Sequence, residues 1–383
     1  MLGTLVAVGI GVLAAGYLLL VAWYRRAWQR LPYYQVPPAY QPATHLSVVV
    51  PARNEEGQIG PCLHSLLAQQ YPPHLLQIIV VDDASTDNTA QLVQAVAAHD
   101  ARVQLLPLPP TVQHAHKKRA IEAGIAAATG TLVVCTDADC THAPQWLRSL
   151  AHAHEVGGAV FVAGPVAYHT QPTVLSVFQT LDFATLQGIT GASVGAGVHA
   201  MCNGASIAYS RQAFYEVGGF KGIDKLPTGD DMLLMYKIWQ RYPQQVQWLK
   251  SRDALVHTHA CPSWQAFLQQ RIRWASKAAY FDDRRIFLVL LLVYLFNAGL
   301  LLLLLTGFFV HAWLGWWALG MLAAKALVEA WMLAPVLRFF QQQRWLRWFG
   351  WLQVPHLLYT VLAGWLGRFG RYQWKGRTIE HQT

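Results

Sequence analysis

Two long stretches without ionised side chains constrain the fold of this chain more than any other feature. Residues 286–324 contain no Asp, Glu, Lys or Arg, and Leu2–Trp23 is a second uncharged, apolar run. A helix needs about 20 apolar residues to cross the hydrocarbon core of a bilayer, which is about 30 Å thick. We therefore expect a membrane anchor at residues 1–24 and further membrane helices within residues 286–367.

The composition supports a division into membrane and aqueous parts. Of the 383 residues, 54% are hydrophobic and 13% are charged, whereas an ordinary soluble domain has roughly 25% charged residues. The net charge of +9 is a balance that nucleic-acid-binding proteins also show. Many of the basic residues flank apolar runs, however, where they are typical of topology signals and of lipid-headgroup contacts. We expect membrane lipids as partners and no nucleic acid.

The basic residues after the first apolar run predict its orientation. Arg25, Arg26 and Arg30 follow the run directly, and by the positive-inside rule they place the next domain in the cytosol. Residues 25–45 are rich in proline, which suits an extended linker. A chain of this design fits the inner membrane of a bacterium, with its aqueous domain on the cytosolic side.

The last apolar stretch, Phe349–Leu366, has basic residues on both sides. Those before it are Arg344 and Arg347, and those after it are Arg368, Arg371, Lys375 and Arg377. One straight crossing cannot place both groups in the cytosol. Either the stretch, which Pro355 interrupts, is re-entrant or interfacial, or the charge rule fails at this end. We favour the first interpretation, with residues 368–383 as a basic cytosolic tail.

Residues 46–250 have the pattern of an α/β domain, because short apolar runs rich in β-branched residues alternate with helix-like segments. The expected strands are residues 46–50, 77–81, 103–106 and 131–136, and the expected helices are residues 59–69, 89–98 and 117–128. Apolar strands separated by helices favour a mostly parallel sheet that is covered on both faces. Ligands of such sheets bind at the carboxyl ends of the strands, and acidic residues of this region lie there.

Two acidic pairs follow predicted strands. Asp137 and Asp139 come after the fourth strand, where two carboxylates can hold Mg²⁺ or Mn²⁺ on a diphosphate. The same short pattern also occurs in simple solvated loops. Asp82 and Asp83 follow the second strand, and carboxylates there can accept hydrogen bonds from a nucleobase or ribose. That segment can equally form a turn and a helix N-cap.

Four further motifs carry polar side chains. Pro51-Ala52-Arg53-Asn54-Glu55-Glu56 follows the first strand, and Lys117 opens a predicted helix. Asp230-Asp231 offers a general base, or acids that stabilise a helix N-terminus. Within residues 251–285, Gln270-Arg271-Ile272-Arg273-Trp274 has the form QxxRW. By itself this last motif is an ordinary juxtamembrane patch of basic and aromatic residues.

In this order, the motifs between about His45 and Lys277 resemble those of the family 2 glycosyltransferases, and the flanking apolar segments resemble the membrane-bound branch of that family. The resemblance implies a GT-A fold, a Rossmann-like nucleotide-sugar-binding domain, at residues 46–250. Glu122 stands where the family more usually has Asn. The positions that carry the resemblance are Pro51, Asn54, Glu55, Asp83, Lys117, Asp137, Asp139, Asp230, Asp231, Gln270, Arg273 and Trp274.

The resemblance also implies a single-displacement reaction with inversion, in which a nucleotide-sugar, favoured as a UDP-sugar, is the donor. Asp231, paired with Asp230, is the expected general base, and Asp139, helped by Asp137, is expected to hold Mg²⁺ or Mn²⁺. The other implied contacts are to the nucleotide-sugar (Pro51, Asn54, Glu55, Asp83, Lys117 and Asp137) and to the acceptor or the leaving diphosphate (Gln270, Arg273 and Trp274).

Several alternatives stay open. The acceptor can be a lipid or a polysaccharide, and the enzyme can add one sugar or act as a processive synthase that secretes its polymer. A sugar nucleotidyltransferase and a non-catalytic membrane scaffold are less favoured. Lys325 and Glu329, four residues apart in an apolar span, form either a functional intramembrane site or a structural pair. We interpret His257 and His259 as a packing feature rather than as metal ligands.

Overall fold

The computed structural model describes residues 2–110, 116–224, 229–276, 283–369, 372–374 and 377–379. Its internal contacts divide the chain into two compact units. We call residues 31–169 and 193–259 the α/β unit, and residues 1–30, 170–192 and 260–383 the helical unit.

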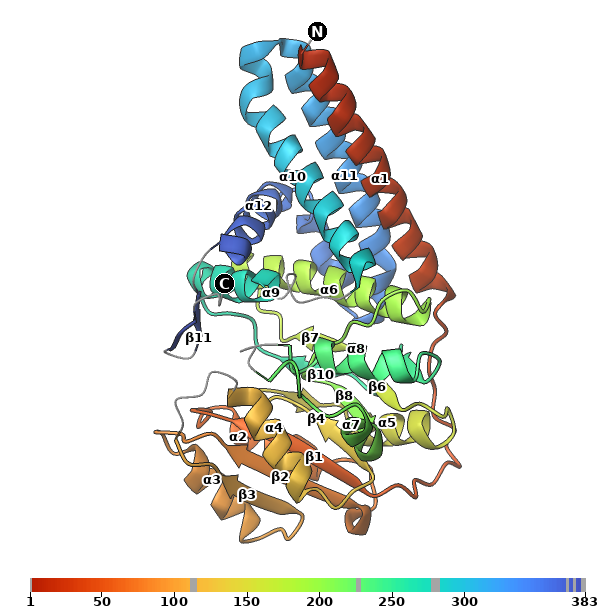
Figure 1. The fold of residues 1–383 in the computed structure, drawn as a ribbon, viewed down its shortest axis with the longest axis vertical. Helices are drawn as coiled ribbons and strands as arrows, with labels where there is room; N and C mark the ends of the chain where they lie inside the picture. The colour runs from red at the N-terminus through yellow and green to blue at the C-terminus, as the bar shows by residue number, and fades with distance from the viewer. Residues whose placement is uncertain are drawn as a thin grey trace. The chain divides into compact units, whose positions relative to one another are not determined.

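The core of the α/β unit is a seven-stranded sheet with the strand order β3-β2-β1-β4-β8-β6-β9 (Figure 1). β1 pairs in parallel with β2 and β4, whereas β8 runs antiparallel to β4 and β6. The predicted strands are all present, and the mostly parallel α/β architecture is confirmed. The strands are β1 (Leu46–Ala52), β2 (Leu76–Asp82), β3 (Val103–Pro107), β4 (Leu132–Cys135), β6 (Phe161–Ala163), β8 (Ile207–Ser210) and β9 (Val246–Trp248).

Burial explains why β1 and β2 read as continuous apolar runs. All seven residues of β2 are buried, and β1 is buried throughout except at Pro51, as in a sheet that is covered on both faces. Helix α4 (His116–Ala127) approaches β1 closely at Gly124, where an added Cβ would clash with the side chain of Val49. Only glycine therefore permits this spacing between helix and sheet.

The strand order reverses direction at β1, with β2 and β3 on one side and β4 on the other. A crevice at such a switch point is where open α/β sheets bind ligands. A second sheet has the order β5-β10-β7. The remaining elements of the unit are α2 (Ile59–Leu67), the 3₁₀-helix Pro73–Leu75, α3 (Thr89–Ala97), β5 (Thr141–His142), α5 (Trp146–Glu155), β7 (Val166–Tyr168), α7 (Arg211–Glu216), α8 (Met232–Arg241) and β10 (Val256–Thr258).

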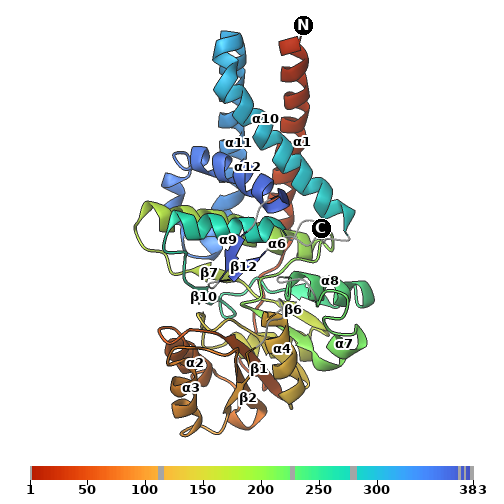
Figure 2. The ribbon, with the colours of Figure 1, turned by 60° about the vertical axis from the view of Figure 1, so that its left-hand side comes forward.

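Three helices of the helical unit, α1 (Leu2–Arg30), α10 (Arg284–Val310) and α11 (Ala312–Phe339), pack side by side (Figures 1 and 2). They are the described helices that are long and apolar enough to cross a membrane. Helix α1 continues to Arg30, into the segment expected as linker, because Trp28 is buried and its ring lies 5.6 Å from that of Phe339.

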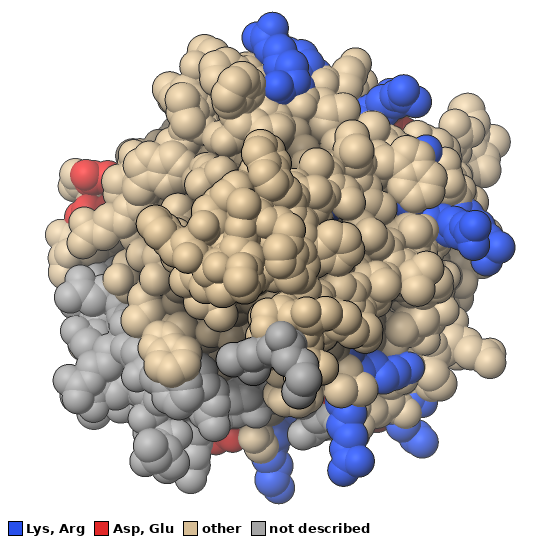
Figure 3. All heavy atoms as spheres, turned by 90° about the horizontal axis from the view of Figure 1, so that it is seen from above, with Lys and Arg blue, Asp and Glu red and all other residues tan. Residues whose placement is uncertain are grey.

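The surface of this bundle suits a hydrocarbon environment. Seen from the end at which the N-terminus lies, the middle of the visible face consists of residues other than Lys, Arg, Asp and Glu (Figure 3). Large apolar side chains of all three helices are exposed, among them Leu19, Leu305 and Leu327. Such exposure would oppose solubility in water and favours contact with lipid.

The remaining helices of the helical unit are α6 (Val174–Gly195), α9 (Trp264–Ser276), the 3₁₀-helix Gln343–Trp348 and α12 (Gln353–Phe369). Helix α6 lies inside the region 46–250 that we expected as one domain, yet residues 170–192 cluster with the helical unit. The reason is close packing on α11, since a Cβ added at Gly188 would lie 2.7 Å from Val336 Cγ2.

Helix α12 corresponds to the last apolar stretch. It is 17 residues long and is not among the described helices that meet the length and composition of a membrane span. Val354, Leu358, Leu362 and Trp365 are exposed along one side of it, a spacing that forms a single helical face. Of the expected tail, residues 368–383, the strands β11 (Tyr372–Trp374) and β12 (Arg377–Ile379) form a short hairpin, and the rest lies largely outside the described residues.

Candidate active site at the carboxyl ends of the strands

The loops after β1 and β2 are joined by hydrogen bonds. Asn54 has a left-handed backbone (φ 52°), and its Oδ1 accepts a hydrogen bond from Thr86 N at 2.8 Å. Its own N–H donates to Ser85 Oγ at 3.0 Å. A positive φ is uncommon outside glycine but is best tolerated by Asn and Asp, so the tertiary contact holds Asn54 in this conformation.

The same two loops hold the other residues predicted to bind the nucleotide. Arg53 donates to Asp83 O at 2.5 Å and lies 3.7 Å from Asp83 Oδ2, and Asp83 is buried. Glu55 N donates to Thr89 Oγ1 at 2.8 Å. Pro51 lies in β1 beyond Val49, the last residue that pairs with β4, so its missing N–H costs no bond to that neighbour.

Lys117, at the start of α4, joins two acidic motifs. Its Nζ lies 2.7 Å from Asp137 Oδ1 and 3.2 Å from Asp230 Oδ2. Burial by itself would lower the pKa of the Lys117 ammonium, but the carboxylates of Asp137 and Asp230 outweigh it and raise that pKa well above its ordinary value. Lys117 is therefore a fixed positive charge between the end of β4 and the start of α8.

Asp231 is the N-cap residue of α8, and its Oδ1 accepts a hydrogen bond from Met232 N at 2.7 Å. Its Oδ2 accepts from Gly204 N at 3.2 Å. Gly229 precedes the acidic pair with φ 87°, a conformation that favours glycine, and its neighbour Thr228 lies outside the described residues. The backbone thus orients both carboxylate oxygens of Asp231.

Two residues near the carboxylates were not named individually from the sequence, although Gly204 lies in the segment 202–214, which resembles the acceptor-side segment of the family. Gly204 lies just before β8, and a Cβ added there would lie 3.4 Å from both Asp231 Cβ and Lys117 Nζ. Thr258 ends β10, and its Oγ1 donates to Asp139 Oδ2 at 3.3 Å. Neither stands out in the sequence, because a single Gly or Thr has no pattern that marks it as part of a site.

Three histidines pack together beside this edge. The His169 ring lies 4.9 Å from that of His257 and 5.3 Å from that of His259. Burial, helped by the neighbouring His169, lowers the pKa of His257 to about 4. His257 is thus neutral at pH 7, and its ring stacks on that of His169.

Asp137 and Asp139 offer a donor set that suits a hard divalent cation. Among the residues that the structure describes, no group of three or more His, Cys, Asp or Glu side chains is placed to hold a metal ion. Mg²⁺ is commonly bound by one or two carboxylates together with substrate phosphates and water. The two aspartates therefore fit a cation whose coordination a diphosphate completes.

The QxxRW residues lie on α9 of the helical unit. Arg271 donates to Gln270 Oε1 at 2.5 Å, and its Cζ lies 4.2 Å from the centre of the Trp274 ring. Gln270, Arg273 and Trp274 are all partly exposed. The structure defines the surroundings of this motif within its own unit, so its participation in the site with the carboxylates stays a prediction.

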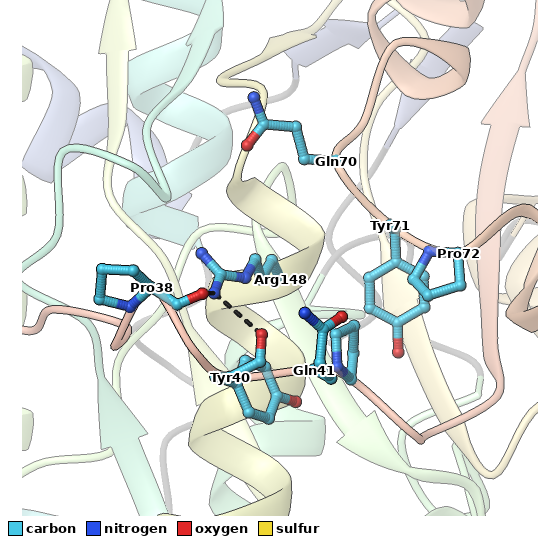
Figure 4. Close-up of a pocket in the computed structure, with 8 residues that line it drawn as sticks. Pro38, Tyr40, Gln41, Gln70, Tyr71, Pro72 and Arg148 are labelled. Carbon is cyan, nitrogen blue, oxygen red and sulfur yellow. Dashed lines mark hydrogen bonds between the residues drawn. The ribbon is translucent and has the colours of Figure 1, made fainter.

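A cavity of about 290 Å³ lies elsewhere in the α/β unit and contains none of the predicted site residues (Figure 4). One Arg148 nitrogen donates to the carbonyl oxygens of Pro37, Pro38 and Tyr40 at 2.8, 3.0 and 2.9 Å. These bonds tie the proline-rich segment to α5. We therefore interpret this region as an anchor for the segment after α1. The lining residues are Pro38, Tyr40, Gln41, Pro42, Gln70, Tyr71, Pro72 and Arg148.

Comparison with known proteins adds to this geometry. Residues 47–218 match the family model described as glycosyl transferase family 2. An N-acetylglucosaminyltransferase of Rhizobium leguminosarum bv. viciae is 28% identical over 313 residues, covering 75% of this chain and 71% of that protein. The poly-beta-1,6-N-acetyl-D-glucosamine synthase of Staphylococcus aureus (strain MSSA476) is 26% identical over 229 residues, covering 58% of this chain and 52% of that protein.

Among solved structures, the mannosyltransferase PcManGT from Pyrobaculum calidifontis, in complex with GDP-Man and Mn²⁺, has a similar fold. The TM-score is 0.59 at 23% identity, and the match covers 95% of this chain and 99% of that one. At this identity the likeness shows a shared fold. The chain spans little more than half the length of several of the curated relatives that it matches.

Proposed function

We propose that this chain is an inverting, membrane-bound glycosyltransferase of family 2 with the GT-A fold, because residues 47–218 match the model of that family and the chain shares its fold with a mannosyltransferase. It moves a sugar from a nucleotide-sugar to a hydroxyl group of a lipid or polysaccharide acceptor. The observation that carries the proposal is the position of Lys117, which draws together Asp137 and Asp230 from separate motifs. Asp231, the proposed base, directly follows Asp230.

Asp231 acts as the general base of this reaction. It accepts the proton of the acceptor hydroxyl while the hydroxyl oxygen forms a bond to the anomeric carbon, and the bond from that carbon to the diphosphate oxygen breaks. Attack from the face opposite the leaving group inverts the configuration. The N–H groups of Gly204 and Met232 fix the orientation of the carboxylate, which preorganises it for proton transfer.

Asp139 and Asp137 are the proposed ligands of Mg²⁺ or Mn²⁺, and the Mn²⁺ in the mannosyltransferase complex supports such an ion. When bound, the cation would neutralise charge that develops on the leaving diphosphate. Thr258 orients Asp139 by its hydrogen bond. Arg273 of the QxxRW motif is the proposed source of further positive charge at the leaving group.

The nucleotide-sugar lies against the loops after β1 and β2 in this proposal. Asp83 contacts the base, and the segment Pro51, Asn54 and Glu55 borders the nucleotide, while Lys117 and Asp137 lie toward the diphosphate. We propose a UDP-sugar as donor, as the resemblance to the family implies, and the N-acetylglucosaminyltransferase relative makes N-acetylglucosamine the first sugar to test. The GDP-Man complex of the mannosyltransferase makes GDP-mannose the second donor to test.

The acceptor is reached at the membrane, where Gln270 and Trp274 would contact it. The three candidate membrane helices support membrane association, and the basic residues Arg25, Arg26 and Arg30 in the last turns of α1 support a cytosolic α/β unit at the inner membrane of a bacterium. Helix α12, with its exposed apolar face, lies in the membrane interface. The similarity to a poly-N-acetylglucosamine synthase supports synthesis of a polymer as the alternative to single addition. In that alternative the enzyme is processive and also secretes its product.

Release of nucleoside diphosphate tests the proposal. The full chain, purified in detergent with Mg²⁺ or Mn²⁺, is incubated with UDP- and GDP-sugars and with lipid or oligosaccharide acceptors. We expect release from one donor, and a loss of at least a hundredfold for Asp231→Asn. Asp100→Asn is the matched control, since Asp100 pairs with Arg102 in a loop that follows α3.

The two variants separate the outcomes. Equal rates for the wild type and Asp231→Asn would remove Asp231 as the base, whereas an equal loss for Asp100→Asn would point to a general effect of losing a carboxylate. Absence of release from every donor and acceptor pair would contradict the proposed donor class.

A further inference from the structure

The QxxRW helix is held by a buried ion pair that the proposed mechanism does not use. Asp182 of α6 and Arg271 of α9 each expose only 4% of their side chains. Arg271 directs two donors to Asp182 Oδ2, Nε at 2.9 Å and a terminal nitrogen at 2.5 Å. Charge-assisted bonds of this kind are stronger and more directional than neutral hydrogen bonds.

Arg271 also contacts two residues of the QxxRW motif, Gln270 and Trp274. Its other terminal nitrogen donates to Gln270 Oε1 at 2.5 Å, and its guanidinium lies over the Trp274 ring at 4.2 Å. Trp274 is also next to Phe183 of α6, with ring centres 6.2 Å apart. The orientation of Gln270 and Trp274 therefore depends on a cation that Asp182 holds in place.

Asp182 is itself held from the opposite side by α12. Tyr359 donates a hydrogen bond to Asp182 Oδ1, and His356 Nε2 lies 3.9 Å from the same oxygen. The other ring nitrogen of His356 lies 3.5 Å from Lys325 Nζ of α11. Polar side chains that lie within 4 Å of one another thus extend from α11 through α12 to the QxxRW helix, all within the helical unit.

Lys325 connects this set to the interior of the bundle. Its Nζ lies 2.9 Å from Glu329 Oε1 and 2.8 Å from Gln353 Oε1, and Glu329 also accepts a hydrogen bond from Tyr17 of α1. An unpaired charge is costly at membrane depth, so these groups keep their partners. Lys325 and Glu329, at the end of this set that is farthest from α9, therefore connect it to α1 and α11.

We propose that Asp182 is a positioning residue for acceptor binding: through Arg271 it sets the orientation of Gln270 and Trp274, and through Tyr359 and His356 it links them to the membrane bundle. The inference rests on the proposed function, in which Gln270 and Trp274 contact the acceptor. Arg271 contacts Gln270 and Trp274, and the nucleotide-binding loops belong to the other unit, so we expect Asp182 to act chiefly on the acceptor side of the reaction.

The test compares acceptor and donor constants of Asp182→Asn in the full chain. We expect the KM for the acceptor to rise about tenfold, because Asn is similar in size but neutral and holds Arg271 weakly. The affinity for the nucleoside diphosphate, measured by calorimetry, is expected to stay within about twofold of the wild type. Asp100→Asn, which breaks a similar carboxylate–arginine pair in the α/β unit, is the matched control and is expected to change neither constant.

A parallel loss of acceptor and donor binding, or no change in either, would overturn the proposal. If Asp182→Asn does not fold, Tyr359→Phe removes one hydrogen bond to Asp182 without leaving a charge unpaired, and we expect the acceptor KM to rise about threefold. An unchanged acceptor KM in that variant would overturn the proposal as well.

Hydrogen exchange separates failure of this inference from failure of the proposed function. If the wild type transfers no sugar, exchange is compared in Asp182→Asn and the wild type. We expect faster exchange of residues 264–276 in the variant and unchanged exchange of residues 76–82 in β2, because the helix loses an anchor while the sheet does not. Unchanged exchange of residues 264–276 would reject the role of Asp182 independently of activity.

Discussion

Lys117 Nζ lies 2.7 Å from Asp137 Oδ1, so a cationic side chain rests on the first carboxylate of the proposed metal motif. The same ammonium group also contacts Asp230, which connects that motif with the base motif. Three motifs that are far apart in the chain therefore form one electrostatic unit. Asp137 and Asp230 both lose their cationic partner when Lys117 is replaced.

Lys117→Met should reduce both activity and stability. Without the ammonium group, two neighbouring carboxylates repel each other, and breaking a fully buried ion pair costs about 3–5 kcal/mol. Lys117 keeps 24% of its side chain exposed, so we expect about 2 kcal/mol and at least a hundredfold loss of transfer. Chemical unfolding and diphosphate release measure these effects. Lys221→Met, at an exposed position, is the control, and an active, stable Lys117→Met protein would contradict the assignment.

Thr258→Val should weaken the proposed metal site. Valine has nearly the same shape as threonine but cannot donate the 3.3 Å hydrogen bond to Asp139 Oδ2. Loss of a group that orients a ligand typically lowers metal affinity about 10- to 100-fold, and we expect the lower end because the aspartates remain. Titration of Mn²⁺ against diphosphate release measures the shift, and chelation of the metal should abolish release in both proteins. An unaltered Mn²⁺ requirement would show that Thr258 does not orient Asp139 for the cation.

The stability of the α/β unit should fall in mild acid because of His142. This buried ring bonds Ser65 and Thr136, and burial lowers its pKa from 6.5 to about 3. Between these values the unfolded chain binds a proton that the folded chain does not, so stability decreases as the pH falls through this window. From the two pKa values we expect a loss of about 2 kcal/mol at pH 5.

Unfolding curves at pH 5 and pH 7 measure this dependence. His142→Gln cannot take up the proton and should reduce the pH dependence, of which His257, with its pKa lowered to about 4, supplies another part. His74→Gln, at an exposed site, should leave the dependence unchanged. A His142→Gln protein with the full wild-type dependence would assign the acid sensitivity to other groups.

Lys325→Met should destabilise the helical unit more than the double change Lys325→Met/Glu329→Met does. The single change leaves the buried Glu329 without the cation that lies 2.9 Å away, which costs about 3–5 kcal/mol. The double change removes both charges and leaves Tyr17 and Gln353 as neutral polar neighbours. Thermal unfolding in detergent compares them. A double variant less stable than the single one would show that Glu329 is stabilised chiefly by Tyr17 and Gln353.

Local patterns determined much of the fold. A short apolar run between turn residues, such as Leu76–Asp82, predicts a buried strand. The prediction was correct here because every residue of β2 is buried. The helices long and apolar enough to cross a membrane were equally clear, since a span must satisfy its backbone within itself and must be apolar along its length. Residues adjacent to strand ends, such as Asp83 and Asp137, could therefore be assigned to one edge of the sheet before any contact was known.

The sequence alone also predicted a family 2 glycosyltransferase, because each motif is a short pattern within one segment and the motifs occur in the order that this family shows. Tertiary structure alone decided which side chains meet: Lys117 with Asp230, Gly204 with Asp231, and Asp182 with Arg271, pairs that lie far apart in the chain. It also assigned α6 to the helical unit. These contacts depend on how helices pack against sheets and against one another, and no periodicity within a short segment encodes the partner that a distant segment will supply.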